Sequence, residues 1–260
     1  MYARHALVRR PSPLLSDGIV THIERSDHVD ADLALKQWRQ YRHAFHEFGW
    51  VTHEVPELDE CPDAVFVEDT MVVYGDLAVI ARAGAPERRP EILAAESKVR
   101  ELGYRVVRIE EPGTLDGGDV LKFDGTVWVG LGGRTNLAGV EQLRAHVTQF
   151  GASVIAVPVA KVLHLKSGVT ALPDGTVIGF EPLVDDPSVW AGHFLSVPEP
   201  SGAHVVHLGE TTVLMAASAP ATARLLEARG LTVVTVDISE FEKLEGCVTC
   251  LSVRLRGLPG

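Results

Sequence analysis

The sequence feature that most constrains the fold is a recurring unit of helix, glycine, strand and hairpin. Four pairs of short β-prone runs are each joined by a turn in which glycine stands beside an acidic residue, which is typical of tight β-hairpins. The hairpins recur about every 50 residues over the first three units, and this period is typical of stacked or radially arranged modules rather than one open sheet. The predicted hairpins cover residues 71–80, 120–129, 169–178 and 204–214.

Helical patterns lie between these hairpins. Apolar residues recur mostly at three- and four-residue intervals, as expected for helices that bury one face. Each pattern ends at or near a glycine, a common C-terminal stop, and an extended run follows each glycine. The predicted helices cover residues 32–48, 90–102, 137–150 and 219–229, and the glycines are Gly49, Gly103, Gly151 and Gly230.

The 260 residues accommodate five modules of this size. The fifth must combine an N-terminal strand at residues 6–9 with a C-terminal strand at residues 248–255, and this pairing would close a ring and remove exposed sheet edges. No Pro/Gly/Ser-rich linker marks a boundary, so we predict a single α/β domain over residues 1–260. A dinucleotide-binding fold is disfavoured because no G-x-G-x-x-G follows a strand.

Charge and cysteine content exclude several classes of protein. The formal net charge is −11, which disfavours a nucleic-acid surface because such a surface needs basic patches. The longest apolar runs, such as residues 153–160, are too short for a membrane span, and the N-terminus has no signal-peptide pattern. Three cysteines are an odd number in a long chain, so we expect a reducing cytoplasmic location without disulfides.

The last cysteine, Cys250, is a candidate nucleophile. With Cys247 it forms a Cys-x-x-Cys pair, a spacing that is also found in zinc and redox sites. A zinc site would need two further ligands, and the sequence offers no second cysteine pair. A redox pair usually opens a helix, whereas this pair lies in a predicted strand. Alone, each cysteine is best interpreted as a small buried hydrophobe.

One histidine and two acidic segments could supply partners for this thiol. His164 follows an apolar strand, and a side chain that titrates near neutral pH is suited to moving a proton at a leaving nitrogen. The acids in 68–69 and in 116–119 interrupt apolar runs, where unpaired charges are costly to bury. Each segment alone is best interpreted as an exposed turn. Together with the thiol they suit attack on a planar cationic carbon such as that of a guanidinium group.

In these segments the chain resembles the guanidine-modifying superfamily (the amidinotransferase/deiminase, or pentein, group) and, within it, the dimethylarginine dimethylaminohydrolase family. The resemblance extends over nearly the whole chain, with the motifs in the family order. It implies a five-bladed α/β propeller built from ββαβ-type modules with pseudo-fivefold symmetry, in agreement with the repeat. The matching stretches are residues 15–19, 62–69, 84–89, 112–119, 134–136, 161–168 and 243–252.

The resemblance also implies a role for each catalytic residue. Cys250 would be the nucleophile, His164 the general acid and base, and Asp116 the carboxylate that orients His164. Glu68 and Asp69 would bind the guanidinium group of the substrate. Carboxylates suit this task because they fix the plane of the cation, so that the thiol attacks from one face.

The remaining implied residues bind the amino-acid end of the substrate. Arg88 and Arg134 would hold the α-carboxylate, since arginine gives planar, bidentate recognition. Asp63 would receive the α-ammonium together with the backbone carbonyls of Ile19 and Leu244. The implied substrate-binding set is Ile19, Asp63, Phe66, Glu68, Asp69, Arg88, Arg134 and Leu244.

The activity implied is hydrolysis of Nω-methylated L-arginine to L-citrulline and dimethylamine or methylamine, through a covalent thiouronium on Cys250. The chemistry requires no metal and no organic cofactor, and the expected partner is a small-molecule substrate. Two alternatives stay open: deimination of unmethylated arginine, and a non-catalytic binding propeller. Formation of a homodimer also stays open. The short chain favours hydrolysis of methylated arginine over deimination, because related deiminases usually carry an extra helical domain.

Overall fold

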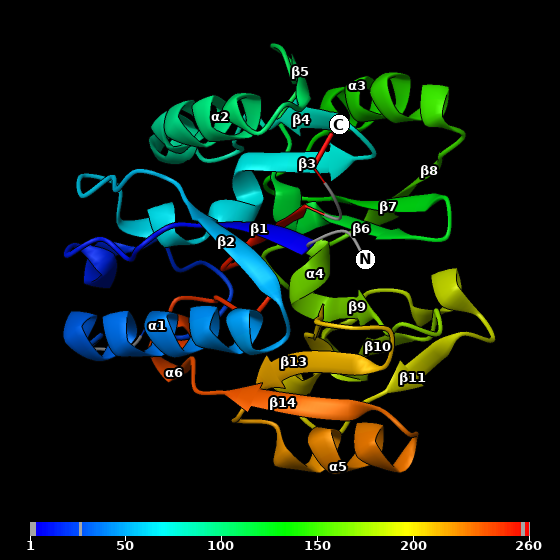
Figure 1. Ribbon diagram of the computed structural model, residues 1–260. Helices are drawn as coiled ribbons and strands as arrows, with labels where there is room; N and C mark the ends of the chain where they lie inside the picture. Colours follow the sequence, from blue (N-terminus) through cyan, green and yellow to red (C-terminus); the bar gives the residue numbers. More distant parts are fainter. Residues whose placement is uncertain (1–3, 26–27, 256–257, 260) are drawn as a thin grey trace.

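The computed structural model describes residues 4–25, 28–255 and 258–259. These residues form five three-stranded sheets arranged around an axis, so the predicted five-bladed α/β propeller is confirmed (Figure 1). The sheets are β15 (Val253–Leu255), β1 (Arg4–Val8) and β2 (Trp50–Glu54); β3 (Met71–Tyr74), β4 (Leu77–Ile80) and β5 (Arg105–Arg108); β6 (Val120–Phe123), β7 (Thr126–Leu131) and β8 (Ser153–Pro158); β9 (Val169–Ala171), β10 (Val177–Gly179) and β11 (Phe194–Ser196); and β12 (Val206–His207), β13 (Thr212–Ala216) and β14 (Thr232–Val236).

All five sheets share one topology. In each, the first two strands pair antiparallel and the third pairs parallel with the second. In the β6–β7 hairpin, Asp124 and Gly125 have φ angles of 44° and 74°, as a type I′ turn requires. The fifth sheet pairs the C-terminal strand β15 with the N-terminal strand β1, so the ring closes as predicted.

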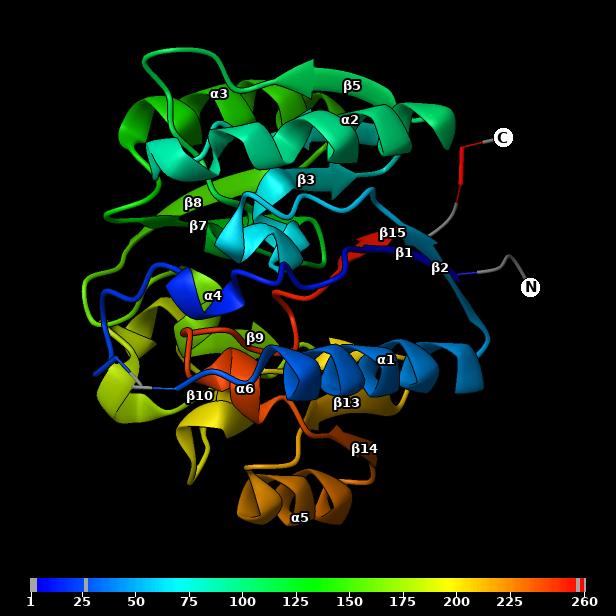
Figure 2. The same cartoon turned by 90° about the vertical axis from the view of Figure 1, so that its left-hand side faces the viewer.

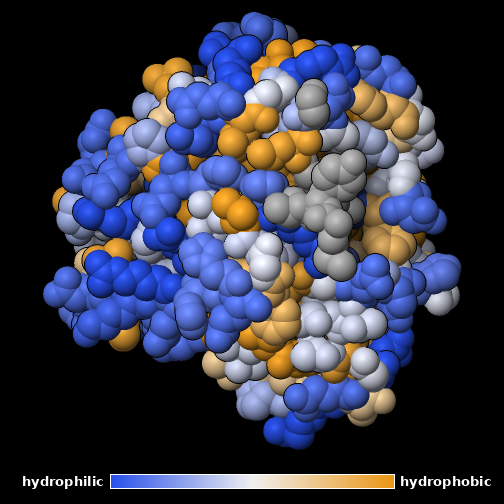
Figure 3. All heavy atoms as spheres, viewed as in Figure 1, coloured by the Kyte–Doolittle hydropathy of each residue, from blue (hydrophilic) through white to orange (hydrophobic). Residues whose placement is uncertain are grey.

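The four longer helices, α1, α2, α3 and α5, each connect the second strand of a sheet to its third. In both ribbon views, α2, α3 and α5 lie at the periphery (Figure 2). Helix α1 begins after Asp30, whose side chain accepts the Leu33 N–H, and it is followed by Gly49 at φ 76°. Hydrophilic side chains largely cover the face of α1 seen in Figure 3. The helices are α1 (Ala31–Glu47), α2 (Ile92–Glu101), α3 (Leu137–Val147), α4 (Leu165–Gly168), α5 (Pro220–Ala228) and α6 (Ser239–Glu242).

The fourth module departs from the pattern. Between β10 and β11 the chain forms two short 3-10 turns, Glu181–Leu183 and Pro187–Trp190, in place of a long helix. Trp190 is buried there against the sheet of this module. The missing helix explains why the regular spacing of the first three modules is not maintained beyond them.

The first strand of each sheet lies toward the axis, since β15 contacts β3 and β6 contacts β9. A short turn or helix precedes each of these inner strands, and these segments carry the buried polar side chains Glu68, Asp69, Thr70, Asp119, Lys166 and Thr249. The fold therefore brings buried polar side chains from four of the five modules toward the centre. The segments are η3 (Val67–Thr70), η5 (Gly117–Asp119), α4, η9 (Pro200–Ala203) and the turn at residues 247–251.

The predicted C-terminal strand is wrong over residues 248–252, where the chain turns. The backbone groups of this stretch bond to other elements instead of to a strand. Tyr41 donates its hydroxyl to the Val248 carbonyl at 2.7 Å, and the Glu68 N–H donates to the Cys250 carbonyl at 3.1 Å. The Cys250 N–H closes a turn onto the Cys247 carbonyl at 3.1 Å. Both cysteines therefore lie in a turn rather than in a strand.

Five apolar clusters fill the space around the sheets, and each draws its residues from more than one module. The cluster beneath α1 includes Trp38, Tyr41 and Phe45, together with Cys247 and Cys250. Rigid packing of this kind holds the central turns in place. Among the described residues, every helix is too short or too polar to cross a bilayer.

Candidate active site

A small, nearly closed cavity brings together nine of the predicted site residues. Its water-accessible volume is about 20 Å³, which is room for about one water molecule. Only Asp116 and Glu68 of the predicted set do not line it. The lining residues are Ile19, Asp63, Phe66, Asp69, Arg88, Arg134, Leu163, His164, Leu244, Glu245, Gly246 and Cys250.

His164 lies between two buried carboxylates. Its Nε2 is 3.1 Å from Asp116 Oδ2, and its Nδ1 is 3.8 Å from Asp69 Oδ1. Burial works to lower the pKa of His164, but Asp69, Asp119 and Asp116 outweigh it and raise that pKa to about 9. The imidazole is therefore protonated at neutral pH. It has a proton ready for a leaving group.

Glycine is needed at position 118 beside this pair. A Cβ at Gly118 would lie 2.6 Å from His164 Nδ1 and 2.7 Å from Asp69 Oδ1. The glycine N–H also donates to Asp69 Oδ1 at 2.9 Å. The second glycine of the Asp-Gly-Gly-Asp motif therefore lets the imidazole and the carboxylate approach each other.

Asp69 is a permanently charged carboxylate in the cavity. It accepts a 2.6 Å hydrogen bond from Arg88 Nη1. Burial works to raise its pKa, but His164 and Arg88 outweigh burial and lower that pKa to about 2. Asp69 consequently presents a fixed negative charge toward any cation that enters the cavity.

The two arginines differ in how many of their donors are free. Arg88 gives Nε and Nη2 to Glu91 at 3.0 and 2.8 Å, and it also bonds Asp69 and two backbone carbonyls. Arg134 has a single long contact, from Nη1 to Asp116 Oδ2 at 3.5 Å. Gly84 leaves room for the Arg134 backbone, which a Cβ would approach to 2.2 Å. Arg134 therefore has more donors to offer to a ligand.

Segment 15–25 covers one side of the cavity. Asp63 accepts the Ile19 N–H at 3.1 Å, although burial raises the pKa of Asp63 against the effect of Arg88. Arg25 donates to the Gly18 and Ser16 carbonyls at 2.9 and 2.7 Å. The covering segment is thus fixed to the cavity wall by Asp63 and held in shape by Arg25.

Glu245 holds the same segment at residues 21–23. Its carboxylate accepts the backbone N–H groups of Thr21 and Ile23 at 3.1 and 3.0 Å and also that of His22. Glu245 has a φ of 61°, a conformation that most side chains avoid. Such strain is typical of a functional position.

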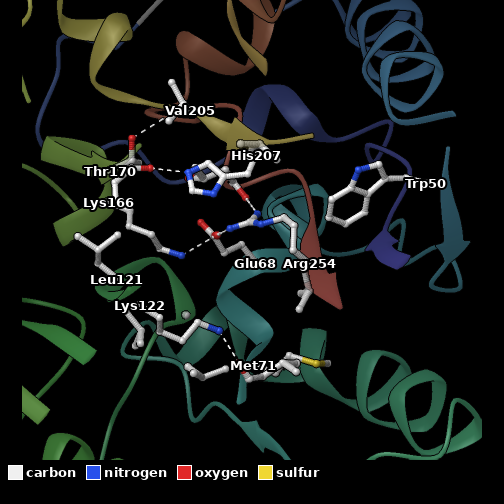
Figure 4. Close-up of a pocket in the computed structure, with 18 residues that line it drawn as sticks. Trp50, Glu68, Met71, Leu121, Lys122, Lys166, Thr170, Val205, His207 and Arg254 are labelled. Carbon is white, nitrogen blue, oxygen red and sulfur yellow. Dashed lines mark hydrogen bonds and ion pairs between the residues drawn. The ribbon is translucent and has the colours of Figure 1, made fainter. Parts of the chain in front are cut away.

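Glu68, like Asp116, does not line this cavity. It pairs with Lys166 Nζ at 2.6 Å and with Arg254, in a second cavity of about 120 Å³ (Figure 4). Glu68 therefore does not face the cavity, and its carboxylate pairs with two cations of other segments, the buried Lys166 and the partly buried Arg254.

The two cysteine sulfurs of the C-terminal turn are in contact. Cys247 Sγ lies 3.2 Å from Cys250 Sγ, and both thiols are free and buried. The hydrogen bond between them lowers the pKa of Cys247 to about 5 and, with burial, raises the pKa of Cys250. At neutral pH the pair therefore shares one proton and one negative charge.

The chain is similar to characterised proteins over its full length. It is 61% identical, over 99% of both chains, to N(G),N(G)-dimethylarginine dimethylaminohydrolase of Streptomyces coelicolor. The chain belongs to the dimethylarginine dimethylaminohydrolase family. Its structure also matches that of the Pseudomonas aeruginosa dimethylarginine dimethylaminohydrolase complexed with citrulline, with 31% identity, a TM-score of 0.89 and coverage of 98% and 100%.

Two further matches support the fold. The N-terminal domain of a cyanobacterial arginine dihydrolase, 19% identical, superposes with a TM-score of 0.86 and covers 99% of this chain and 100% of that domain. Residues 3–182 match the model of a family described as RNA-editing substrate-binding complex 5 protein. That range ends before Cys250. The match therefore covers the blades that carry His164 and Asp116 but not the thiol.

The site of this dimethylarginine dimethylaminohydrolase family member includes one group that could ligate a metal. Suitable atoms of Asp69, Asp116 and His164 lie within 4.8 Å of one another, and all three residues are buried. Arg88 and Arg134 contact the two carboxylates and supply positive charge there. A cation would have to compete with these guanidinium groups and with the protonated imidazole.

Sequence analysis did not select several residues that build this dimethylarginine dimethylaminohydrolase site. Glu91 holds Arg88, and their i,i+3 spacing on a helical segment was the available signal. Asp119, which the sequence singled out together with Asp116 but to which no role was assigned, accepts the Leu165 N–H at 2.9 Å and so fixes the backbone next to His164. Leu163, Glu245 and Gly246 also line the cavity, and the first two lie beside the selected residues His164 and Leu244.

Proposed function

We propose that this chain hydrolyses Nω-methylated L-arginine, such as asymmetric dimethylarginine or monomethylarginine, to L-citrulline and dimethylamine or methylamine. It is a hydrolase that acts on the C–N bonds of linear amidines. The observation that carries the proposal is the cavity that collects Cys250, His164, Asp69, Asp63 and Arg134. Full-length identity of 61% to a dimethylarginine dimethylaminohydrolase supports it.

Binding in this proposal uses charge complementarity at three points. Asp69 receives the guanidinium. In this proposal Glu68 does not contact the substrate and acts only through the 3-10 turn that it shares with Asp69. Arg134 receives the α-carboxylate. Arg88 lines the same wall, and it would join by giving up a bond that it now makes to protein. Such charged contacts are bidentate and directional, so they fix the substrate for attack.

The α-ammonium is assigned to Asp63. The carbonyls of Ile19 and Leu244, which line the cavity beside it, complete this part of the proposed site. An ammonium would replace the Ile19 N–H now bonded to Asp63 and would favour the charged carboxylate. Because the closed cavity holds about 20 Å³, the segment over residues 15–25 has to open for a substrate to enter.

The first chemical step forms a covalent intermediate. The cationic guanidinium favours the thiolate of Cys250, which adds its electron pair to the central carbon. His164 donates its proton to the methylated nitrogen, and the C–N bond breaks to release the amine. The product is a planar thiouronium on Cys250. Asp116 is a positioning residue that holds the His164 ring and favours its charged form.

The second step returns the enzyme to its starting state. Neutral His164 takes a proton from water as the water oxygen adds to the thiouronium carbon. The C–S bond then breaks with its electron pair on Cys250, and the remaining hydroxyl proton passes to solvent, where the released amine takes up a proton. This leaves citrulline and a protonated His164. One water is consumed for each methylated amine released.

A paired-substrate assay tests the proposal. Purified protein is incubated separately with asymmetric dimethylarginine and with arginine, and citrulline formation is measured for each. We expect turnover of the methylated substrate and little or none of arginine. Turnover of arginine alone would favour the deiminase alternative, and the absence of citrulline from both would favour a non-catalytic propeller.

The proposal extends to the domain organisation and the location of the protein. The proposed chemistry uses side chains of a single protomer. We propose that residues 1–260 act as one catalytic domain. We also propose a reducing, cytoplasmic location, because three cysteines are an odd number in a chain of this length.

A further inference from the structure

Cys247 is a buried nucleophilic group for which the proposed hydrolysis has no use. It was set aside at the sequence level because the Cys-x-x-Cys pair was expected in a strand. The structure instead places the pair in a turn closed by the bond from the Cys250 N–H to the Cys247 carbonyl. The sulfurs are already 3.2 Å apart, and a disulfide needs a further approach of only about 1.2 Å.

The local chemistry favours reaction between these two sulfurs. Their shared hydrogen bond keeps a thiolate in the pair at neutral pH, and the thiolate is the form that reacts with oxidants and disulfides. Thr249 Oγ1, 3.2 Å from Cys247 Sγ, also contacts this sulfur. Cys250 lines the substrate cavity, so a small oxidant can reach it by the substrate's path.

We propose that Cys247 and Cys250 form a reversible intramolecular disulfide under peroxide, and that this bond switches off and protects the nucleophile. The switching part rests on the proposed function, in which Cys250 attacks the substrate. The disulfide itself rests only on the positions of the two sulfurs.

The reaction balances in two steps. The proton that the pair shares moves to Cys247, and the resulting thiolate of Cys250 attacks one peroxide oxygen; the O–O bond breaks, and the second oxygen leaves as water after protonation, so that Cys250 becomes a sulfenic acid. Cys247 then attacks the sulfenic sulfur, the S–O bond breaks, and a second water leaves. Two thiols are oxidised by two electrons as one peroxide is reduced. A dithiol reductant returns two electrons and two protons.

The same geometry gives Cys247 a protective role. A sulfenic acid with no neighbouring thiol proceeds to sulfinic acid, which dithiol reductants do not reverse. Because Cys247 is already in contact, the intramolecular reaction has a high effective concentration and outruns a second oxidation. The oxidised enzyme is therefore expected to be inactive but recoverable.

Intact-mass analysis and peptide mapping test the disulfide without any activity measurement. After limited peroxide treatment, the wild-type protein should lose two hydrogen atoms in mass and yield a peptide in which Cys247 is linked to Cys250. The matched control is Cys61→Ser, which removes the third buried thiol and should leave this product unchanged. Oxygen addition at Cys250 without a linked peptide, or linkage to Cys61, would overturn the proposal.

The Cys247→Ser variant tests protection, because serine can keep a hydrogen bond to Cys250 but cannot form the disulfide. Citrulline formation is measured before peroxide, after it and after dithiothreitol, each relative to the untreated variant. Wild type should recover most of its rate, whereas Cys247→Ser should gain oxygen and recover less than about a tenth. Equal recovery would refute protection. A linked peptide in a protein that hydrolyses no methylarginine would count only against the proposed function.

Discussion

Replacing Asp116 with asparagine should lower both the rate of hydrolysis and the pH at which activity is lost on the alkaline side. The carboxylate lies 3.1 Å from His164 Nε2, is fully buried, and helps to raise the pKa of His164 from 6.5 to about 9. A hydrogen bond to a charged group contributes about 1.5–3 kcal/mol. This corresponds to about one to two pH units.

The direction in which activity changes with pH follows from the role proposed for His164. The first step needs the protonated imidazole, so activity is present below the pKa of His164 and is lost as the pH rises through it. In the wild type this limb of the kcat/KM profile should fall near pH 9. In Asp116→Asn it should fall at about pH 7–8, and kcat should drop about 100-fold because the ring loses its orientation.

The assay is citrulline formation from asymmetric dimethylarginine between pH 6 and about pH 10. Asp76→Asn is the matched control. It removes one carboxylate from an exposed hairpin, where Asp76 pairs with Arg105. This control should leave the profile unchanged. A normal kcat in Asp116→Asn, or a lower kcat with an unmoved alkaline limb, would refute the reasoning about His164.

Three further variants test other parts of the site. Cys250→Ala should abolish citrulline formation while calorimetry still detects binding of asymmetric dimethylarginine, and a wild-type rate would contradict the nucleophile assignment. Glu68→Gln should lower the free energy of unfolding by about 3 kcal/mol, measured by denaturant titration, because it leaves the cations of Lys166 and Arg254 unpaired; an unchanged midpoint would contradict this. Glu245→Gln should weaken the bonds to the backbone of residues 21–23, so hydrogen exchange there should be faster and KM altered. Unchanged exchange would show that Glu245 does not hold the covering segment.

Most of the fold could be predicted because its elements are defined by local patterns. The helix expected over residues 32–48 is α1 at Ala31–Glu47, and the hairpin expected over residues 71–80 is β3 and β4. Two features depended on distant contacts and were missed. Tyr41 captures the Val248 carbonyl, which prevents a long C-terminal strand, and short turns replace the helix of the fourth module.

The candidate site could be predicted as a set of residues but not in every orientation. Glu68 and Asp69 are adjacent in a tight 3-10 turn, so their side chains point to different sides of it. Sequence adjacency does not show which one faces the substrate. That choice is made by the cations on each side, Arg88 for Asp69 and Lys166 with Arg254 for Glu68, and these come from several different modules.

The repeat itself explains why the site lies where it does. In each module a short turn or helix lies directly before the inner strand, near the axis. Asp69, Asp116, His164 and Cys250 lie in or beside these turns, in chain order. Each of four modules supplies one of these groups, and the propeller brings them to one site.

The pairing that closes the ring therefore positions catalytic residues as well as stabilising the fold. The covering segment follows β1, and Cys250 precedes β15, so the two lie at opposite ends of the chain. Along the chain they are connected only by way of all the modules between them. The pairing of β1 with β15, in which His5 lies opposite Leu255, brings them together directly. Any change that loosens this pairing should separate the thiol from Ile19 and Asp63 before it unfolds the other blades, because those blades keep their own sheets and apolar clusters.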